Sequence, residues 1–381
     1  MVCKGAKVYT ENHIFEKKDL YIKGRRIESG SPGEGEAVFD ASGLYAIPGL
    51  VDIHFHGCVG EDLCEADEEG LRKIAQYQAE NGVLAICPAT MTYGEEKLSR
   101  ICQQIAAFAE KQDEKAEGME ADLVGIHLEG PFLSEEKLGA QNPAYLALPD
   151  AAMVERLQEK AKGLIKLVDV APELEGSEAF IRELGEKMKI SLAHTNATYE
   201  QALQAFEAGA GHITHLYNAM PGMHHRMPGP VIAAMEQGAE AELICDGVHV
   251  HPAMVRLTFK LFGRDKVILI SDSMEACGLP DGVYQLGGQS VTVKGNRAVL
   301  TENPDTIAGS TTNLLKCMRV AVKEAGIPLE DAVRACTENP ARAIGVEDVY
   351  GSLTPGHMAN VVFLDGELQI RAIIQKGKLY Q

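Results

Sequence analysis

The sequence predicts an α/β protein in which a (β/α)8 TIM-like barrel carries a small β-sandwich domain built from both termini. Eight apolar, strand-like runs recur between residues 50 and 271, and most gaps between them hold an amphipathic helical stretch. Short β-prone pieces separated by turns occupy the two ends of the chain instead. We therefore expect residues 49–349 to form the barrel and residues 1–48 with 350–381 to form the small domain.

The small domain is predicted from segments at both ends that are rich in β-branched and aromatic residues. They are residues 8–10, 20–23 and 37–39 near the start, and 360–365, 370–375 and 378–380 near the end. Such short segments need partners to be stable, and the two sets can supply them to each other.

The barrel is predicted from eight runs that alternate with helices. The runs cover residues 50–56, 83–87, 123–128, 165–170, 190–194, 212–216, 243–246 and 267–271. Helices are expected at 69–80, 97–110 and 199–208, the last opening on a capping box of Thr198 and Gln201. A further helix is expected to start with Asn339 as N-cap and Pro340 at its first position. An open doubly wound sheet is the alternative, but no Gly-x-Gly-x-x-Gly follows the first strand.

Composition excludes several classes of protein. The 36 basic and 55 acidic residues give a net charge of −19, which disfavours binding to nucleic acid. No run of 18 apolar residues predicts a membrane span, and residues 1–7 lack the apolar core of a secretory signal. The nine cysteines include no Cys-x-x-Cys pair, so we expect reduced thiols and a cytoplasmic protein.

Polar side chains gather where the predicted strands end. In a barrel of this type the carboxyl ends of the strands carry the functional groups. Six of the eight predicted strands end in, or run directly into, a histidine or a carboxylate: His54 and His56, Glu129, His194, His215, Asp246 with His249, and Asp272.

Burying histidines and carboxylates without partners in an apolar barrel mouth costs free energy. A divalent metal ion that binds them would offset this cost. His54 and His56 lie two residues apart on a strand, so both point to one face and can share an ion. Glu129, His194 and His215 could converge on a second position. We expect His127 and His212 to be hydrogen-bonded structural residues instead.

Two segments resemble the opening and closing motifs of the metal-dependent amidohydrolases. These are residues 48–57, PGLVDIHFHG, and residues 351–360, GSLTPGHMAN, in which Asn360 stands where Asp is commoner. Residues 127–132, 193–197, 215–220 and 271–274 are similar to motifs of one family within them, the N-acetylglucosamine-6-phosphate deacetylases. The resemblance covers nearly the whole chain.

This resemblance implies roles for particular residues. Metal ligands are implied at Glu129, His194 and His215, with Asp272 as the catalytic acid and base. Because the chain keeps His54 and His56, which some members lack, one or two ions per subunit are possible. Zinc is the first candidate, with iron, manganese or cobalt as alternatives.

Contacts to a phosphosugar substrate are implied as well. The implied residues are Gln141, Asn218, Ala219 through its backbone, Arg226, His249 and Ile307. Gln141 stands where some members place a histidine that contacts the substrate amide. In relatives the residue at Arg226 reaches the neighbouring subunit's site, which implies a homodimer. The segment His224-His225-Arg226, together with His249 and with His251 as a further candidate, is expected to supply cations for the phosphate.

The implied activity is hydrolysis of the acetamide of N-acetyl-D-glucosamine 6-phosphate to D-glucosamine 6-phosphate and acetate. N-acetylgalactosamine 6-phosphate, which differs at one hydroxyl, is an alternative substrate. Another alternative is a cyclic-amide hydrolase with a carboxylated lysine on the fourth strand, but Lys166 lies near the start of that strand. A non-catalytic metal-stabilised binding module would have no need of the spare carboxylate of Asp272.

Overall fold

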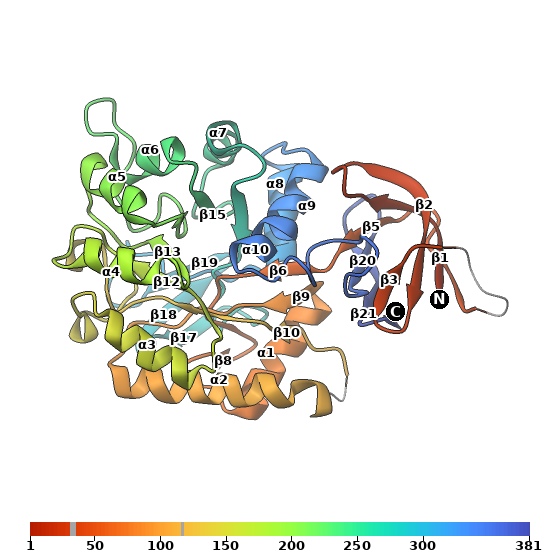
Figure 1. Ribbon diagram of the computed structural model, residues 1–381, viewed down its shortest axis with the longest axis horizontal. Helices are drawn as coiled ribbons and strands as arrows, with labels where there is room; N and C mark the ends of the chain where they lie inside the picture. Colours follow the sequence, from red (N-terminus) through yellow and green to blue (C-terminus); the bar gives the residue numbers. More distant parts are fainter. Residues whose placement is uncertain (31–35, 116–117) are drawn as a thin grey trace.

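The computed structural model describes residues 1–30, 36–115 and 118–381, and it confirms the predicted barrel (Figure 1). Eight strand positions follow one another in parallel pairing around it. In order they are β6 (Leu50–Asp52), β9 (Val83–Ile86), β10 (Asp122–Leu123) with β11 (Ile126–Leu128), β12 (Ile165–Val170), β13 (Lys189–Leu192), β14 (His212–Ile213), β15 (Glu240–Ile244) and β16 (Val267–Ile270).

Two features close the ring. The third position is split, so that β10 pairs with β9 while β11 pairs with β12. The eighth and first positions meet beyond their strands, where the Asp272 amide donates to His54 O (2.9 Å) and the His56 amide donates to Ser273 O (2.7 Å). The backbone that closes the barrel is therefore the backbone that carries candidate site residues.

Helices cover the outside of the barrel (Figure 1). One follows each strand position: α1 (Glu68–Glu80), α2 (Glu95–Lys115), α3 (Ala151–Lys160), α4 (Ser177–Leu184), α5 (Tyr199–Ala208), α6 (Gly229–Glu236), α7 (Pro252–Phe262) and α8 (Leu314–Lys323). Two more, α9 (Leu329–Cys336) and α10 (Glu338–Ala343), follow α8.

Two predicted helix starts have different outcomes. The capping box of Thr198 and Gln201 is present at the start of α5. The start predicted at Asn339 is wrong, because α10 begins at Glu338 and contains both Asn339 and Pro340. The Asn339 side chain caps no helix; its amide donates to Arg264 O and Val267 O (2.8 Å each), which ties α10 to the start of β16.

Strands from both termini form the small domain beside the barrel (Figure 1). They are β1 (Val2–Tyr9), β2 (Phe15–Lys23), β3 (Arg26–Glu28), β4 (Val38–Asp40), β5 (Tyr45–Pro48), β20 (Val361–Leu364), β21 (Ile370–Gln375) and β22 (Lys378–Tyr380). Hydrogen bonding joins them into one continuous eight-stranded sheet, whose buried side chains share one core. The reason is the length of β1, which pairs with β4 near its start and with β5 near its end.

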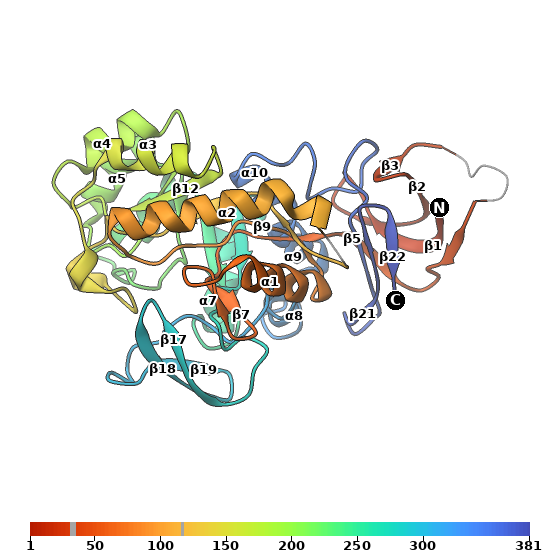
Figure 2. The same cartoon turned by 90° about the horizontal axis from the view of Figure 1, so that it is seen from below.

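An antiparallel sheet that the sequence analysis did not anticipate lies between β16 and α8. It consists of β17 (Gly282–Leu286), β18 (Gln289–Lys294) and β19 (Arg297–Leu300), and Figure 2 shows it projecting from one side of the barrel. The short hairpin of β7 (Gly57–Cys58) and β8 (Glu61–Asp62) follows the first barrel strand.

Within the described residues, no helix combines the length and apolar character that crossing a bilayer requires. All nine cysteines are free and buried.

Candidate metal centre

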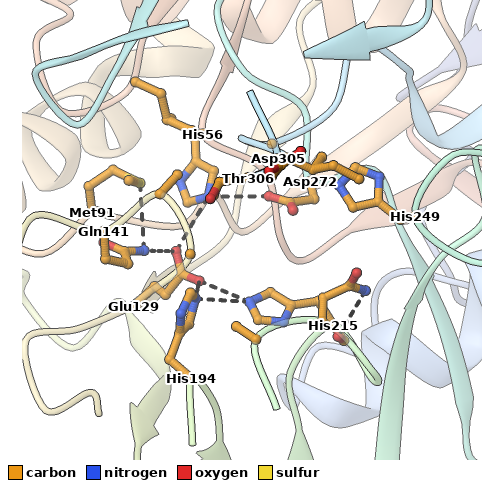
Figure 3. Close-up of a pocket in the computed structure, with 17 residues that line it drawn as sticks. His56, Met91, Glu129, Gln141, His194, His215, His249, Asp272, Asp305 and Thr306 are labelled. Carbon is orange, nitrogen blue, oxygen red and sulfur yellow. Dashed lines mark hydrogen bonds and ion pairs between the residues drawn. The ribbon is translucent and has the colours of Figure 1, made fainter. Parts of the chain in front are cut away.

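A cavity of about 260 Å³ opens at the carboxyl ends of the barrel strands (Figure 3). Its wall brings together side chains that the sequence predicts at six strand ends: His56, Glu129, His194, His215, His249 and Asp272. His54 lies beneath them and is fully buried.

Glu129, His194 and His215 form one tight cluster. The Nε2 atoms of His194 and His215 lie 3.0 and 3.2 Å from the same oxygen, Glu129 Oε1. These two ring nitrogens are 3.2 Å from each other, and the other nitrogen of His194 contacts Lys137 O (2.9 Å). Two imidazole nitrogens converging on one buried carboxylate oxygen fit a divalent metal ion.

His54, His56 and Asp272 lie on the other side of Glu129. His56 Nε2 is 3.3 Å from both Glu129 Oε2 and Asp272 Oδ1. His54 Nε2 is 3.7 Å from Glu129 Oε1 and 3.9 Å from Asp272 Oδ1. His54, His56 and Glu129 therefore offer a second set of donor atoms, with Glu129 shared between the two sets.

Electrostatics in the cluster favour ionised carboxylates. Burial alone would raise the pKa of Glu129, but hydrogen bonds with His194 and His215 outweigh it and hold that pKa well below its ordinary value. Burial would also raise the pKa of Asp272, but the hydrogen bond with His56 and the charges of the neighbouring histidines together lower it. The same contact raises the pKa of His56 to about 9 despite its burial. A metal ion would have to displace the His56 proton, so acid should weaken binding.

Three of these residues have a strained backbone. His194, His215 and Asp272 have φ values of 42°, 28° and 49°, in the left-handed region that residues other than glycine seldom adopt. Each such residue costs about 1–3 kcal/mol, and such strain gathers at functional sites. Hydrogen bonds on both sides hold Asp272, whose amide donates to His54 O and whose carbonyl accepts from the Ser310 amide (2.7 Å).

His127 and His212 lie deeper in the barrel, outside the cavity wall. Both ring nitrogens of His127 face oxygen atoms, Ile53 O at 3.2 Å and Asp169 Oδ1 at 2.9 Å. Burial opposes its protonation, but Asp169 raises the pKa of His127 to about 10. His212 Nδ1 bonds to Ser191 Oγ at 2.8 Å. Both are hydrogen-bonded interior residues, in line with the structural role expected of them.

Four expected substrate contacts line the cavity: Asn218, Ala219, His249 and Ile307. His249 is held by Asp246, whose carboxylate accepts from its backbone amide and lies 2.8 Å from its Nδ1. Burial would lower the pKa of His249, but this contact raises it, and His249 correspondingly lowers the pKa of Asp246.

Gln141 lies differently from what its expected role suggests, and Arg226 lies away from the cavity of its own chain. Gln141 lines the cavity, but its amide group donates to Glu129 Oε2 (2.8 Å) while its oxygen accepts from the Thr92 amide (2.8 Å). Its position therefore supports Glu129. Arg226 is exposed and lies outside this cavity, beside a hollow between the start of α5 and the loop before α6.

Further residues of the cavity wall were missed by the sequence analysis. They are Met91, Gly139, Ala140, Leu286, Asp305, Thr306 and Gly309. All but Leu286 belong to loops, where periodicity carries no signal, and Leu286 belongs to the unanticipated sheet. Lys166 lies at the opposite end of the barrel, beside the starts of β12 and β13, so it cannot reach this cavity.

Residues 45–379 match the amidohydrolase family. The N-acetylglucosamine-6-phosphate deacetylase of Bacillus subtilis (strain 168) is 35% identical over 387 residues, covering 100% of this chain and 96% of that protein. The N-acetylgalactosamine-6-phosphate deacetylase of Escherichia coli O157:H7 is also 35% identical, over 87% of this chain and 86% of that protein.

A similar solved structure is that of a Mycobacterium smegmatis N-acetyl-D-glucosamine-6-phosphate deacetylase mutant in complex with N-acetyl-D-glucosamine-6-phosphate. It superposes with a TM-score of 0.91 at 32% identity, and the match covers 100% of this chain and 98% of that one.

Proposed function

The chain belongs to the amidohydrolase family, and from this premise we propose that it hydrolyses N-acetyl-D-glucosamine 6-phosphate to D-glucosamine 6-phosphate and acetate. The observation that carries the proposal is the carboxylate of Asp272, which faces the cavity beside two sets of metal-ligating atoms that share Glu129. Relatives of known name that match the full length of the chain include deacetylases of this substrate. The activity belongs to amino-sugar metabolism, and we propose a cytoplasmic location.

One or two divalent ions per chain would be held at this site, zinc first, with iron, manganese or cobalt as alternatives. Glu129, His194 and His215 would hold one, and His54, His56 and Glu129 would hold the other. Such an ion supplies Lewis acidity and lowers the pKa of bound water toward about 7. The buried nitrogen and oxygen donors fit this chemistry, whereas the nine thiols lie outside both sets.

Asp272 moves the proton in this proposal. Its lowered pKa keeps it ionised at neutral pH, so it can accept a proton from the attacking water. The carbon–nitrogen bond of the acetamide then breaks, and Asp272 returns the proton to the departing sugar nitrogen. Water thus adds across the amide bond and Asp272 ends ionised, ready for another turnover.

Asn218, the Ala219 backbone, His249 and Ile307 would contact the sugar and its phosphate. Gln141 would act by holding Glu129 in place. Arg226 would complete the phosphate site of a neighbouring subunit in a homodimer, because it is exposed and outside its own cavity.

Asp246→Asn should move the pH dependence of substrate binding. The raised pKa of His249 keeps its ring cationic as pH rises above the ordinary value of about 6.5, so it can bind the anionic substrate there. Without the Asp246 carboxylate, the proton is lost at lower pH. KM at pH 8 should rise about tenfold, since a charged hydrogen bond contributes about 1.5–3 kcal/mol. Steady-state kinetics from pH 6 to 9 measure this.

A matched control is His251→Ala, which alters an exposed histidine that caps α7 and does not belong to the cavity wall. It should leave the pH profile of KM unchanged. A profile for Asp246→Asn that coincides with the wild-type profile would contradict the proposed role of His249.

Arg226→Ala should raise KM for the phosphorylated sugar by about 100-fold and leave KM for N-acetylglucosamine nearly unchanged. The guanidinium group offers two parallel hydrogen bonds to phosphate, and the unphosphorylated sugar has no partner for them. Arg182→Ala, which alters an exposed arginine paired with Glu178, should change neither value. Equal losses on both substrates would count against phosphate binding by Arg226.

The same variant tests whether Arg226 acts across a dimer. Mixed dimers of Arg226→Ala and Asp272→Asn subunits contain one site with an intact Asp272 and an intact partner Arg226. Activity should therefore return on mixing after subunit exchange. No return of activity would place Arg226 in its own subunit's site.

The experiment that tests the proposed reaction is acetate release from the two epimeric N-acetylhexosamine 6-phosphates, run on protein of known metal content. We expect kcat/KM to be higher for the gluco epimer. A preference for the galacto epimer would favour the second candidate, which the Escherichia coli relative supports. Release from neither sugar would overturn the proposal.

A further inference from the structure

Glu242 is a buried carboxylate to which the proposed reaction gives no role. It lies in β15 and is fully buried below the cavity. One of its oxygens, Oε2, is 2.9 Å from His54 Nδ1 and accepts from the backbone amide of His215 (3.2 Å). Its backbone carbonyl also accepts from the Leu216 amide (2.8 Å). The strand and these contacts fix the carboxylate directly behind His54.

The contact with Glu242 orients the ring of His54. A proton on Nδ1 that is shared with the carboxylate leaves the lone pair on Nε2. That Nε2 atom is buried and has no hydrogen-bond partner in the described part of the chain. It faces Glu129 Oε1 at 3.7 Å and Asp272 Oδ1 at 3.9 Å. A cation between the two carboxylates would satisfy this buried lone pair.

His54 differs in this respect from the other histidines of the centre. Nδ1 of His56 bonds to the backbone carbonyl of Ala89 (3.2 Å), and Nδ1 of His194 bonds to that of Lys137 (2.9 Å). His54 Nδ1 instead contacts a side-chain carboxylate. A carboxylate behind a metal-bound imidazole fixes its tautomer and makes it a stronger ligand.

His54, Glu242 and His127 also lie close enough to suggest an ion among themselves. The contacts of His127 argue against it. Its two ring nitrogens face Ile53 O and Asp169 Oδ1, so both carry protons and neither offers a lone pair. Glu242 therefore acts toward the cavity, through His54.

We propose that Glu242 is the positioning residue that gives this chain its second metal position, by holding Nε2 of His54 toward Glu129 and Asp272. The inference rests on the proposed metal ligands. It adds the residue that determines whether the chain binds one metal ion or two. Glu242 contacts the imidazole ring of His54 but only the backbone amide of His215. Its loss should therefore weaken metal binding by His54, His56 and Glu129 more than metal binding by Glu129, His194 and His215.

Metal binding to the purified full-length chain tests this. Zinc content per chain is measured by mass spectrometry after saturation, and affinity is measured by competition with a chelator. Wild type should bind two zinc ions. Glu242→Gln keeps an acceptor oxygen and should weaken the second ion about 10- to 100-fold. Glu242→Leu should bind one ion, as should His54→Ala, which removes the ligand itself.

Glu240→Gln is the matched control, because Glu240 lies on the same strand but pairs with Lys189 and Arg342 at the other end of the barrel. It should bind two ions with wild-type affinity. Circular dichroism checks that each variant folds. If Glu242→Leu does not fold, the affinity of the second ion in the isosteric variant Glu242→Gln tests the inference.

Three results would overturn the inference: a single ion in saturated wild type, two ions of unchanged affinity in Glu242→Gln, or equal loss of both ions in that variant. These measurements use no substrate. A chain that binds two ions and releases no acetate would contradict the proposed function and leave the role of Glu242 standing.

Discussion

Replacing Asp272 with asparagine is expected to lower kcat by about 10²- to 10⁴-fold, the contribution of a general acid–base residue. Asparagine keeps the size of the side chain but cannot accept the proton from water or return it to the sugar nitrogen. KM should change little, so kcat and kcat/KM should fall together. Steady-state acetate release measures both.

The metal content of this variant separates loss of chemistry from loss of the centre. The ion held by Glu129, His194 and His215 should remain, because Asp272 lies outside that cluster. Asp305→Asn is a suitable control, since Asp305 lines the same cavity outside the ligand sets, and its kcat should stay near that of wild type. Wild-type turnover in Asp272→Asn would remove Asp272 from the mechanism.

Replacing Glu129 with glutamine is expected to remove metal from both positions at once. Its Oε1 atom faces His194 and His215, and its Oε2 atom faces His56, so one substitution affects both donor sets. Loss of the ion forfeits several kcal/mol of transition-state stabilisation, which corresponds to about 10²- to 10⁴-fold in kcat.

Thermal unfolding provides a second readout for Glu129→Gln. A ligand that binds only the folded state raises Tm. Added zinc should therefore raise the Tm of wild type and of Asp305→Asn but not that of Glu129→Gln. A zinc-dependent rise in Tm of equal size in Glu129→Gln would show that Glu129 is not a shared ligand.

The barrel and most of its site could be predicted because parallel strands place their carboxyl ends together. Glu129, His194, His215 and Asp272 were found by applying that rule to apolar runs far apart in the sequence. Some of the predicted apolar runs are longer than the strands that they contain. Strand β6 ends at Asp52, so His54 and His56 lie beyond it. The backbone of these two histidines forms hydrogen bonds with the segment that follows β16.

Glu242 illustrates why part of the centre could not be predicted. The seventh strand was expected over residues 243–246, but it covers residues 240–244. Glu240 and Glu242 lower the hydropathy of its first half and so hide where it begins. A charged residue in the middle of a buried strand is a usable signal only once the start of the strand is known.

The sheet of β17, β18 and β19 had a local signal that went unused. Gly287 and Gly288 both have positive φ values and form a two-residue turn between β17 and β18. A Gly-Gly pair between alternating segments is typical of a hairpin. The contribution of this insertion to the cavity, through Leu286 and the loop at Asp305, depends on tertiary packing that no local pattern encodes.

Acetate release from N-acetyl-D-glucosamine 6-phosphate, measured as chelator-treated protein is reloaded stepwise with zinc, tests the central claim most directly. We predict no release from the metal-free chain and a rate that rises with the zinc bound per chain. In Asp272→Asn, the same zinc should bind while the rate stays near zero. Release that is independent of bound metal, or fully loaded wild type that releases no acetate, would contradict the account.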